Sequence, residues 1–196
     1  MPAPAMKLHP EPHPSRVFVL GTGRCGTTTV IEACGHLTNF TAGHETRAHL
    51  AGEERFDYPP GHVEADNRLA WFLGALDVHF GGEPLYLHLR RDPQAVAASF
   101  ERRWGRGIIG AFSRSILMGG PEADRHAVCD FYVRTVTSNI EAFLRDKPRQ
   151  MTVWLEEYRE WFPDFWSRVG AEGDLDAAVA EFGVRHNAHT GDARLD

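Results

Sequence analysis

The sequence predicts an α/β fold in which a mostly parallel central sheet lies between two layers of helices. Three observations favour this architecture: short apolar runs occur at intervals, amphipathic stretches separate them, and glycine or proline punctuates the boundaries. Strands of a parallel sheet are buried on both faces and therefore read as continuous apolar runs. Residues 16–20 (RVFVL) and 85–89 (LYLHL) have that form.

The predicted elements alternate along the chain. The expected strands span residues 16–20, 38–42, 63–65, 85–89 and 151–155. The expected helices span residues 27–37, 69–80, 93–104, 108–118, 123–144, 157–169 and 174–182. Residues 51–61 are polar and contain two prolines, so a loop is expected there. Asp92 followed by Pro93 is typical of a helix N-cap with proline in the first turn.

Length and composition limit the class of protein. A chain of 196 residues favours one domain, here residues 16–196, preceded by a proline- and histidine-rich tail at 1–15. The net charge of −6 argues against a general nucleic-acid binder.

Three cysteines, with neither a CxxC pair nor metal-ligand spacing, favour a reducing compartment and no metal site. The sequence begins without the apolar segment of a signal peptide, and no run approaches the roughly 20 apolar residues of a membrane helix. We therefore expect a cytoplasmic protein with no integral membrane segment; the sequence predicts no particular oligomeric state.

A glycine-rich turn, Gly21–Thr29, joins the first predicted strand to the first predicted helix. A helix start offers unpaired N–H groups and the positive end of the helix dipole, and glycines let an anion approach, so this turn is expected to cradle a phosphate. Three patterns fit it. Glycines 21, 23 and 26 satisfy the dinucleotide fingerprint G-x-G-x-x-G, with Glu45 as the acidic ribose ligand. The ATP-binding pattern G-x-x-x-x-G-K-[ST] also fits, except that Thr27 occupies the lysine position. The third pattern, G-x-x-R-x-G-T-T, includes Arg24 and both following threonines; a turn without any ligand remains the fourth interpretation.

The third pattern resembles the 5′-phosphosulfate loop of sulfotransferases that use 3′-phosphoadenosine 5′-phosphosulfate (PAPS) and release 3′,5′-diphosphoadenosine (PAP). The resemblance implies a three-layer fold like that of P-loop nucleoside triphosphate hydrolases, and a reaction that requires no metal. It implies that Arg24 stabilises the negative charge that grows on the oxygen bridging phosphorus and sulfur. It also implies that Cys25 contributes its backbone rather than a nucleophilic thiol. The implied cofactor-binding residues of the loop are Gly23, Arg24, Cys25, Gly26, Thr27, Thr28 and Thr29.

A second pair of residues, Arg91 and Ser99, has the spacing that sulfotransferases use to hold the 3′-phosphate. If Asp92 caps a helix, two positions eight residues apart point within roughly 80° of each other, because an α-helix has 3.6 residues per turn. Both side chains can then face one anion. The alternative is a solvated arginine and a serine on a helix surface.

The segment Gly43–Arg47 (GHETR) resembles the GEETR segment of tyrosylprotein sulfotransferases, in which a glutamate is the general base. The resemblance implies that Glu45 takes the proton of the acceptor hydroxyl; His44 is the alternative, because small-molecule sulfotransferases use a histidine. A surface ion pair between Glu45 and Arg47 is the structural interpretation of the same residues.

Arg47 together with Asp66, Asn67 and Arg68 forms the candidate acceptor site. The last three, together with Glu64, cluster just before a predicted helix that carries Trp71 and Phe72, and polar groups beside aromatic rings suit a sugar or a phenol. Equally, Asp66 or Asn67 caps that helix while the aromatic rings fill the core.

The chain departs from the sulfotransferase pattern in two places. Thr29 stands where many relatives have a tryptophan that stacks on adenine, and no Arg-Lys-Gly segment occurs near the C-terminus, where Arg185, His186 and Asn187 are the possible substitutes. The expected function is transfer of a sulfuryl group from PAPS to the hydroxyl of a small-molecule or glycan acceptor (a carbohydrate, a phenol or a lipid). The alternatives are a nucleotide kinase that needs Mg²⁺ and a sulfotransferase-like module that binds a nucleotide without catalysis.

Overall fold

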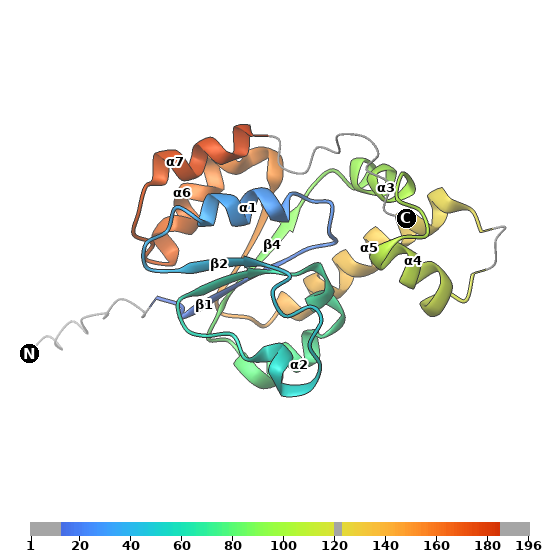
Figure 1. Ribbon diagram of the computed structural model, residues 1–196, viewed down its shortest axis with the longest axis horizontal. Coiled ribbons are helices and arrows are strands. Elements are labelled where there is room, and N and C mark those ends of the chain that lie inside the picture. The colour runs from blue at the N-terminus through green and yellow to red at the C-terminus, as the bar shows by residue number, and fades with distance from the viewer. Residues whose placement is uncertain (1–12, 120–122, 185–196) are drawn as a thin grey trace, which may run out of the picture.

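The computed structural model describes residues 13–119 and 123–184 and has a parallel sheet at its centre (Figure 1). The strands are β1 (Arg16–Leu20), β2 (Thr41–His44), β3 (His62–Ala65), β4 (Leu85–Arg90) and β5 (Gln150–Trp154). Their order across the sheet is β2-β3-β1-β4-β5, and every pair of neighbours is parallel. The predicted α/β class with a parallel central sheet is confirmed.

Alternation within β1 divides the core into two parts. Val17 and Val19 belong to one apolar cluster, whereas Phe18 and Leu20 belong to the other, because successive side chains of a strand point to opposite faces. Helices α1 (Thr27–Cys34), α6 (Tyr158–Arg168) and α7 (Leu175–Ala180) cover the valine face. Helices α2 (Leu73–Phe80), α3 (Pro93–Glu101), α4 (Gly107–Ala111) and α5 (Arg125–Leu144) cover the other. The three predicted layers are therefore present (Figure 1).

Short helical turns account for most differences from the predicted boundaries. They are the 3-10 helices Gly52–Phe56, Asn67–Trp71, Leu155–Glu157 and Glu181–Gly183, and the π-helical turn Phe112–Ile116. The helix expected at 69–80 is divided because Phe72 leaves helical geometry (φ −125°, ψ 26°). The helix expected at 108–118 becomes α4 plus the π-helical turn. The loop expected at 51–61 contains one 3-10 helix.

The second strand begins three residues later than predicted. The amide of Thr38 donates to the carbonyl of Glu172 and Leu37 bridges to Gly173, so this stretch pairs with the segment before α7 instead of with β3. The first helix accordingly ends at Cys34 rather than at residue 37. The helix cap predicted at Asp92 is confirmed, because Asp92 accepts a hydrogen bond from the amide of Ala95 at the start of α3.

Because all five strands are parallel, the loops that leave their carboxyl ends lie along one edge of the sheet. The chain runs from β1 toward β2 on one side and from β4 toward β5 on the other, so the strand order reverses between β1 and β4. Ligands of open α/β sheets bind at such a switch point. The loops after β1 and β4, which carry Arg24 and Arg91, meet there.

None of the helices within residues 13–119 and 123–184 is long and apolar enough to cross a membrane. The predicted C-terminal substitutes Arg185, His186 and Asn187, and residues 1–12 of the predicted tail, lie outside the described residues.

Candidate active site

The loop after β1 has a backbone shaped by three residues in left-handed conformations. Gly23, Arg24 and Gly26 have φ values of 77°, 60° and 95°. A Cβ added at Gly23 would lie 2.6 Å from Asn67 Nδ2, so a side chain there would displace a buried neighbour. Gly26 is the N-cap of α1 and, as a glycine, provides no side-chain cap to that helix start. The loop thus presents backbone N–H groups and a helix N-terminus, the arrangement that binds phosphate in many proteins.

Arg24 connects this loop to the segment after β4. It is a non-glycine residue in a left-handed conformation, which costs free energy and is held only where the surrounding structure enforces it. Its Nε donates a hydrogen bond to Ser99 Oγ at 3.0 Å, and its carbonyl oxygen accepts one from Arg91 Nη1 at 3.3 Å. Arg91 Nε also lies 3.8 Å from a carboxylate oxygen of Glu156. The three residues predicted for the two ends of one nucleotide therefore lie together.

Positive charge is concentrated around Arg24. Burial lowers the pKa of its guanidinium, and the charges of Arg103, Arg102 and Arg91 lower it further. Like charges held this close favour an anion between them. Sequence reasoning missed Arg102 and Arg103; the run ERRWGRG, which begins two residues after Ser99, is the pattern that could have indicated them.

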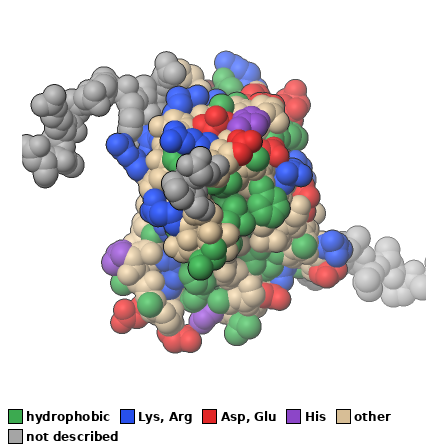
Figure 2. Space-filling model, turned by 90° about the vertical axis from the view of Figure 1, so that its right-hand side faces the viewer, with side chains coloured by type: hydrophobic (Ala, Val, Ile, Leu, Met, Phe, Trp, Pro, Cys, Tyr) green, Lys and Arg blue, Asp and Glu red, His purple; other side chains and the backbone are tan. Residues whose placement is uncertain are grey.

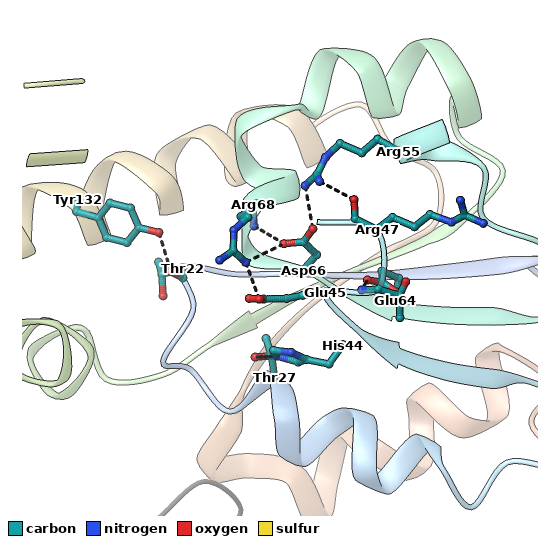
Figure 3. A network of polar contacts seen from close by, with 11 residues as sticks. Thr22, Thr27, His44, Glu45, Arg47, Arg55, Glu64, Asp66, Arg68 and Tyr132 are labelled. Atoms are coloured by element: carbon teal, nitrogen blue, oxygen red, sulfur yellow. Dashed lines mark hydrogen bonds and ion pairs between the residues drawn. The ribbon is translucent and has the colours of Figure 1, made fainter. Parts of the chain in front are cut away.

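Thr27 and His44 bring the end of β2 to the same place. Thr27 Oγ1 and His44 Nε2 are 3.0 Å apart, and Thr27 is buried at the first position of α1 (Figure 3). The alternative base predicted from the sequence therefore contacts the first residue of α1, directly after the loop that follows β1.

Glu45 follows β2 in a left-handed conformation, with φ 55°. Its carboxylate pairs with Arg68, the Nη1 and Oε2 atoms being 2.6 Å apart (Figure 3). Arg47, two residues on, turns elsewhere: its guanidinium donates to the carbonyl of Glu54 and lies 3.8 Å from Asp57. The described contacts thus join Glu45 to Arg68, in place of the Glu45–Arg47 surface pair considered from the sequence.

The other predicted acceptor residues are buried. Asp66 has no exposed surface, accepts from the amide of Arg68 at 2.8 Å, and pairs with Arg55 at 2.9 Å. Burial raises the pKa of its carboxyl. It caps the 3-10 helix Asn67–Trp71, as the structural interpretation of this motif predicted. Asn67 is also buried, and its Oδ1 has no hydrogen-bond partner among the described residues.

Aromatic rings fill the core between the loop after β1 and α5, as the structural interpretation of Trp71 predicted: Tyr132 and Phe112 are buried, and Trp71 packs against them. The hydroxyl of Tyr132 donates to the carbonyl of Thr22 at 2.8 Å, which ties α5 to the phosphate loop. The Trp71 ring centroid lies 6.4 Å from that of Tyr132 and 6.0 Å from that of Phe112, whose centroid in turn lies 6.0 Å from that of the exposed Phe131. Figure 2 views the end of the molecule where α4 and the start of α5 lie, and hydrophobic side chains gather on that face. Phe72 does not join this cluster of rings, because it packs under Arg55 instead.

Cys25 lies within the loop after β1, but its thiol is buried and burial raises its pKa. A buried thiol with a raised pKa is a poor nucleophile. Among the residues that the structure describes, no group of three or more histidine, cysteine, aspartate or glutamate side chains has the arrangement of a metal site.

Comparison with known proteins identifies the fold. No protein-family model matches the sequence, and no curated protein is significantly similar to it. Solved structures do match. The sulfotransferase domain from the curacin biosynthetic pathway superposes with a TM-score of 0.62 at 13% identity, over 93% of this chain and 82% of that domain. The sulfotransferase domain from the Synechococcus PCC 7002 olefin synthase gives 0.60 at 14% identity, over 94% and 83%. Mouse sulfotransferase SULT7A1 complexed with PAP gives 0.53 at 11% identity, over 91% and 68%. The chain therefore has the sulfotransferase fold, in agreement with the resemblance in its motifs.

Proposed function

We propose that the protein is a sulfotransferase that moves a sulfuryl group from PAPS to the hydroxyl of a carbohydrate, phenol or lipid acceptor. The observation that carries the proposal is the contact of Arg24 with both Ser99 and Arg91 across the sheet's switch point. PAPS has anionic groups at both its 5′ and 3′ ends, and this arrangement offers cations to both. The PAP complex of a protein with the same fold supports the same donor.

The residues present fit this donor. The amides from Gly23 to Thr29, with the hydroxyls of Thr27 and Thr28, suit the 5′-phosphosulfate, and the added Cβ at Gly23 or Gly26 would crowd the loop. Arg91 and Ser99 suit the 3′-phosphate, and the nearby Arg102 and Arg103 add positive charge. When bound, PAPS supplies an activated sulfuryl group whose leaving group is the PAP anion.

The chain's own residues have distinct roles in this proposal. The Glu45 carboxylate accepts the proton of the acceptor hydroxyl, a contribution of about 10²–10⁴-fold in rate. The Arg24 guanidinium stabilises the negative charge that develops on the departing phosphate. Arg68 orients the Glu45 carboxylate through their ion pair. Holding the two reactants in line contributes up to roughly 7–11 kcal/mol.

The acceptor site combines polar and apolar groups. The buried Asn67 Oδ1 and the indole N–H of Trp71 have no hydrogen-bond partner among the described residues, and a small movement of the Asn67–Trp71 turn would let an acceptor's polar atoms pair with them. The half-buried ring of Trp71, which packs against the buried rings of Phe112 and Tyr132, supplies the apolar part. We also propose a cytoplasmic location, which the three buried free thiols of Cys25, Cys34 and Cys129 support.

Nucleotide binding separates this function from its alternatives. Thermal-shift titrations compare PAP, ATP with Mg²⁺, and NAD on the same protein. We expect PAP to raise the melting temperature most. Stabilisation by ATP or NAD alone would contradict the proposal. We expect ATP to bind weakly, because Thr27 replaces the phosphate-binding lysine of ATP-binding loops.

Transfer activity then separates the enzyme from a binding module. ³⁵S-labelled PAPS is incubated with a panel of simple alcohols, phenols and monosaccharides, using wild type, Glu45→Ala and His44→Ala. We expect Glu45→Ala to lose at least about 10²-fold in kcat if it is the base, and His44→Ala to lose less. The reverse order would make His44 the base. Tight PAP binding with no transfer to any acceptor would identify a non-catalytic module.

A further inference from the structure

Two buried carboxylates lie two residues apart on and just after β3. Glu64 is within the strand and Asp66 follows its end, so both point to the same side of the sheet. Neither has any exposed surface. A buried carboxylate is costly unless hydrogen bonds satisfy it, so what each one holds is informative.

Glu64 holds the segment that follows the candidate base. Its Oε1 accepts from the amide of Thr46 at 2.8 Å, and its Oε2 accepts from Thr46 Oγ1 at 2.7 Å. His62 Nε2 lies 3.0 Å from the same Oε2, and His62 Nδ1 lies 2.8 Å from Thr41 Oγ1. Glu64 therefore ties the residue after Glu45 to β3, while His62 ties the start of β2 to the same strand.

The atoms around the contact between Glu64 and Thr46 are closely packed. A Cβ added at Gly43 would lie 2.4 Å from Thr46 Cγ2 and 3.0 Å from Glu64 Oε2. Between Gly43 and Thr46, Glu45 has its left-handed conformation, and its own amide donates to the carbonyl of Ala65 at 3.0 Å. The strained backbone of Glu45 is thus anchored to β3 at its own amide and at the next residue, which is how an unfavourable φ persists.

Asp66 holds the partner of the candidate base. Its Oδ1 accepts from the amide of Arg68 at 2.8 Å and lies 3.9 Å from Arg68 Nη1, and its Oδ2 accepts from Arg55 Nη2 at 2.9 Å. Arg55 in turn donates to the carbonyl of Arg47, on the β2 side of the site (Figure 3). Asp66 thereby fixes the turn that carries Arg68.

We propose that Glu64 and Asp66 are positioning residues: Glu64 fixes the backbone that aims Glu45, and Asp66 fixes the arginine that pairs with it. The inference rests on the proposed function in which Glu45 is the base. It assigns Asp66 a role behind Arg68 in place of contact with the acceptor. An apolar side chain at position 64 would leave the Thr46 amide and hydroxyl without their partner, and the segment that follows Glu45 would lose this anchor to β3.

A double-mutant cycle tests the proposal with the full chain, PAPS and the best acceptor of the panel described above. The variants are Glu64→Gln, Glu45→Ala and the two together, with Asp66→Asn in a parallel cycle. If Glu64 acts through Glu45, Glu64→Gln lowers kcat by about 10-fold or more in the wild-type background and by less than about 2-fold when Glu45 is already absent. Affinity for PAP, measured by calorimetry, stays within about 2-fold in each variant, because neither carboxylate contacts the phosphate loop in the described structure.

Val63→Ala is the matched control. Val63 is fully buried on the same strand and belongs to the apolar cluster on the opposite face, so its truncation lowers stability without touching the Glu64 contacts. All assays are made well below the melting temperature of the least stable variant. The control should change kcat little, and equally in both backgrounds. Equal losses for Glu64→Gln with and without Glu45 would overturn the positioning role.

Amide hydrogen exchange provides a readout that needs no turnover. Glu64→Gln should reduce protection of the Thr46 amide and Asp66→Asn that of the Arg68 amide, while the amide of Val19 in β1 keeps its protection. Val63→Ala should instead affect the sheet broadly. Unchanged protection at Thr46 and Arg68 would overturn the proposal. Wild-type protein that binds PAP but transfers no sulfuryl group would refute the proposed function, and the exchange data would still decide whether the two carboxylates hold these segments.

Discussion

Arg24 and Ser99 are 75 residues apart in the sequence, yet Arg24 Nε donates a hydrogen bond to Ser99 Oγ over 3.0 Å. The contact exists because β1 and β4 are neighbours in the sheet, so the loop after one strand meets the helix after the other. The proposed 5′ and 3′ ends of the donor site are therefore coupled through one arginine. A change at Arg24 should be felt at both ends.

Arg24→Ala should lower kcat/KM for PAPS by about 10²–10³-fold, the usual effect of removing one charge-stabilising donor. Arg24→Lys keeps the charge but loses the Nε–Ser99 hydrogen bond, so its loss should be intermediate. Steady-state kinetics with varied PAPS measures both. Arg145→Ala, which removes an exposed arginine at the end of α5, controls for the change in total charge. An Arg24→Ala enzyme as active as this control would contradict the role.

Arg91→Ala should weaken PAP far more than adenosine 5′-phosphate, which lacks the 3′-phosphate. Loss of a hydrogen bond to a charged group costs about 1.5–3 kcal/mol, or roughly 10- to 150-fold in affinity. Calorimetric titration of both nucleotides measures the difference. Arg90→Ala is the matched control, because Arg90 pairs with Glu141 and stacks on Trp154. Equal losses for both nucleotides in Arg91→Ala would refute a 3′-phosphate role.

The sequence was most informative where local chemistry decides the structure. The buried strand at residues 16–20, the glycine-rich turn that leads into a helix and the Asp92 cap all depend on neighbours in the chain, and each was predictable. The partner of Glu45 was not. Arg47 is adjacent in sequence, but the pairing with Arg68 depends on β2 and β3 being neighbours.

The interruption of the predicted helix at Phe72 could not be predicted for a related reason. Residues 69–80 have helical periodicity, yet the Phe72 side chain is 42% exposed and packs under the Arg55 guanidinium, 4.7 Å from its ring centroid. The same Arg55 guanidinium forms the buried ion pair with Asp66. The periodicity of a sequence predicts which residues share the apolar face of a helix, but it does not predict contacts with a buried ion pair from another segment.

Gly23→Ala should destabilise the protein and weaken PAP binding together. The substitution combines a φ of 77° with a Cβ only 2.6 Å from the buried Asn67 side chain. Gly52→Ala is the matched control, since its φ is 64° but nothing lies within 4 Å of the added Cβ. Overpacking typically costs 1–3 kcal/mol, so Gly23→Ala should lose about that much more free energy of unfolding than Gly52→Ala. Urea denaturation measures the difference, and equal losses would show that the crowding at Gly23 is relieved without cost.

His88, on β4, should make the fold sensitive to acid. Burial, and secondarily the charge of Arg90, lowers its pKa to about 4, and its Nδ1 has no hydrogen-bond partner among the described residues. The unfolded chain, with a histidine pKa near 6.5, binds this proton more readily than the folded chain does. The contribution of neutral His88 is therefore fully present above about pH 6.5 and is lost as pH falls toward 4, by up to about 3 kcal/mol.

The pH dependence of unfolding in urea, compared between wild type and His88→Asn, isolates this contribution from the carboxylates that titrate over part of the same range. The wild-type free energy of unfolding should fall more steeply than that of the variant between pH 6.5 and 4, because only in the wild type does the unfolded chain gain a proton at position 88 that the folded chain does not bind. His126→Asn is the control with the opposite sign. His126 is exposed, and its hydrogen bond to Glu101 raises its pKa, so its contribution is lost as pH rises and its removal leaves the acid limb intact. If the free energy of unfolding depends on pH in the same way for wild type and His88→Asn, then His88 has a water or another polar partner in the folded protein. The cavity of about 20 Å³ beside His88, lined in part by Thr22 and Arg91, is the place for that partner.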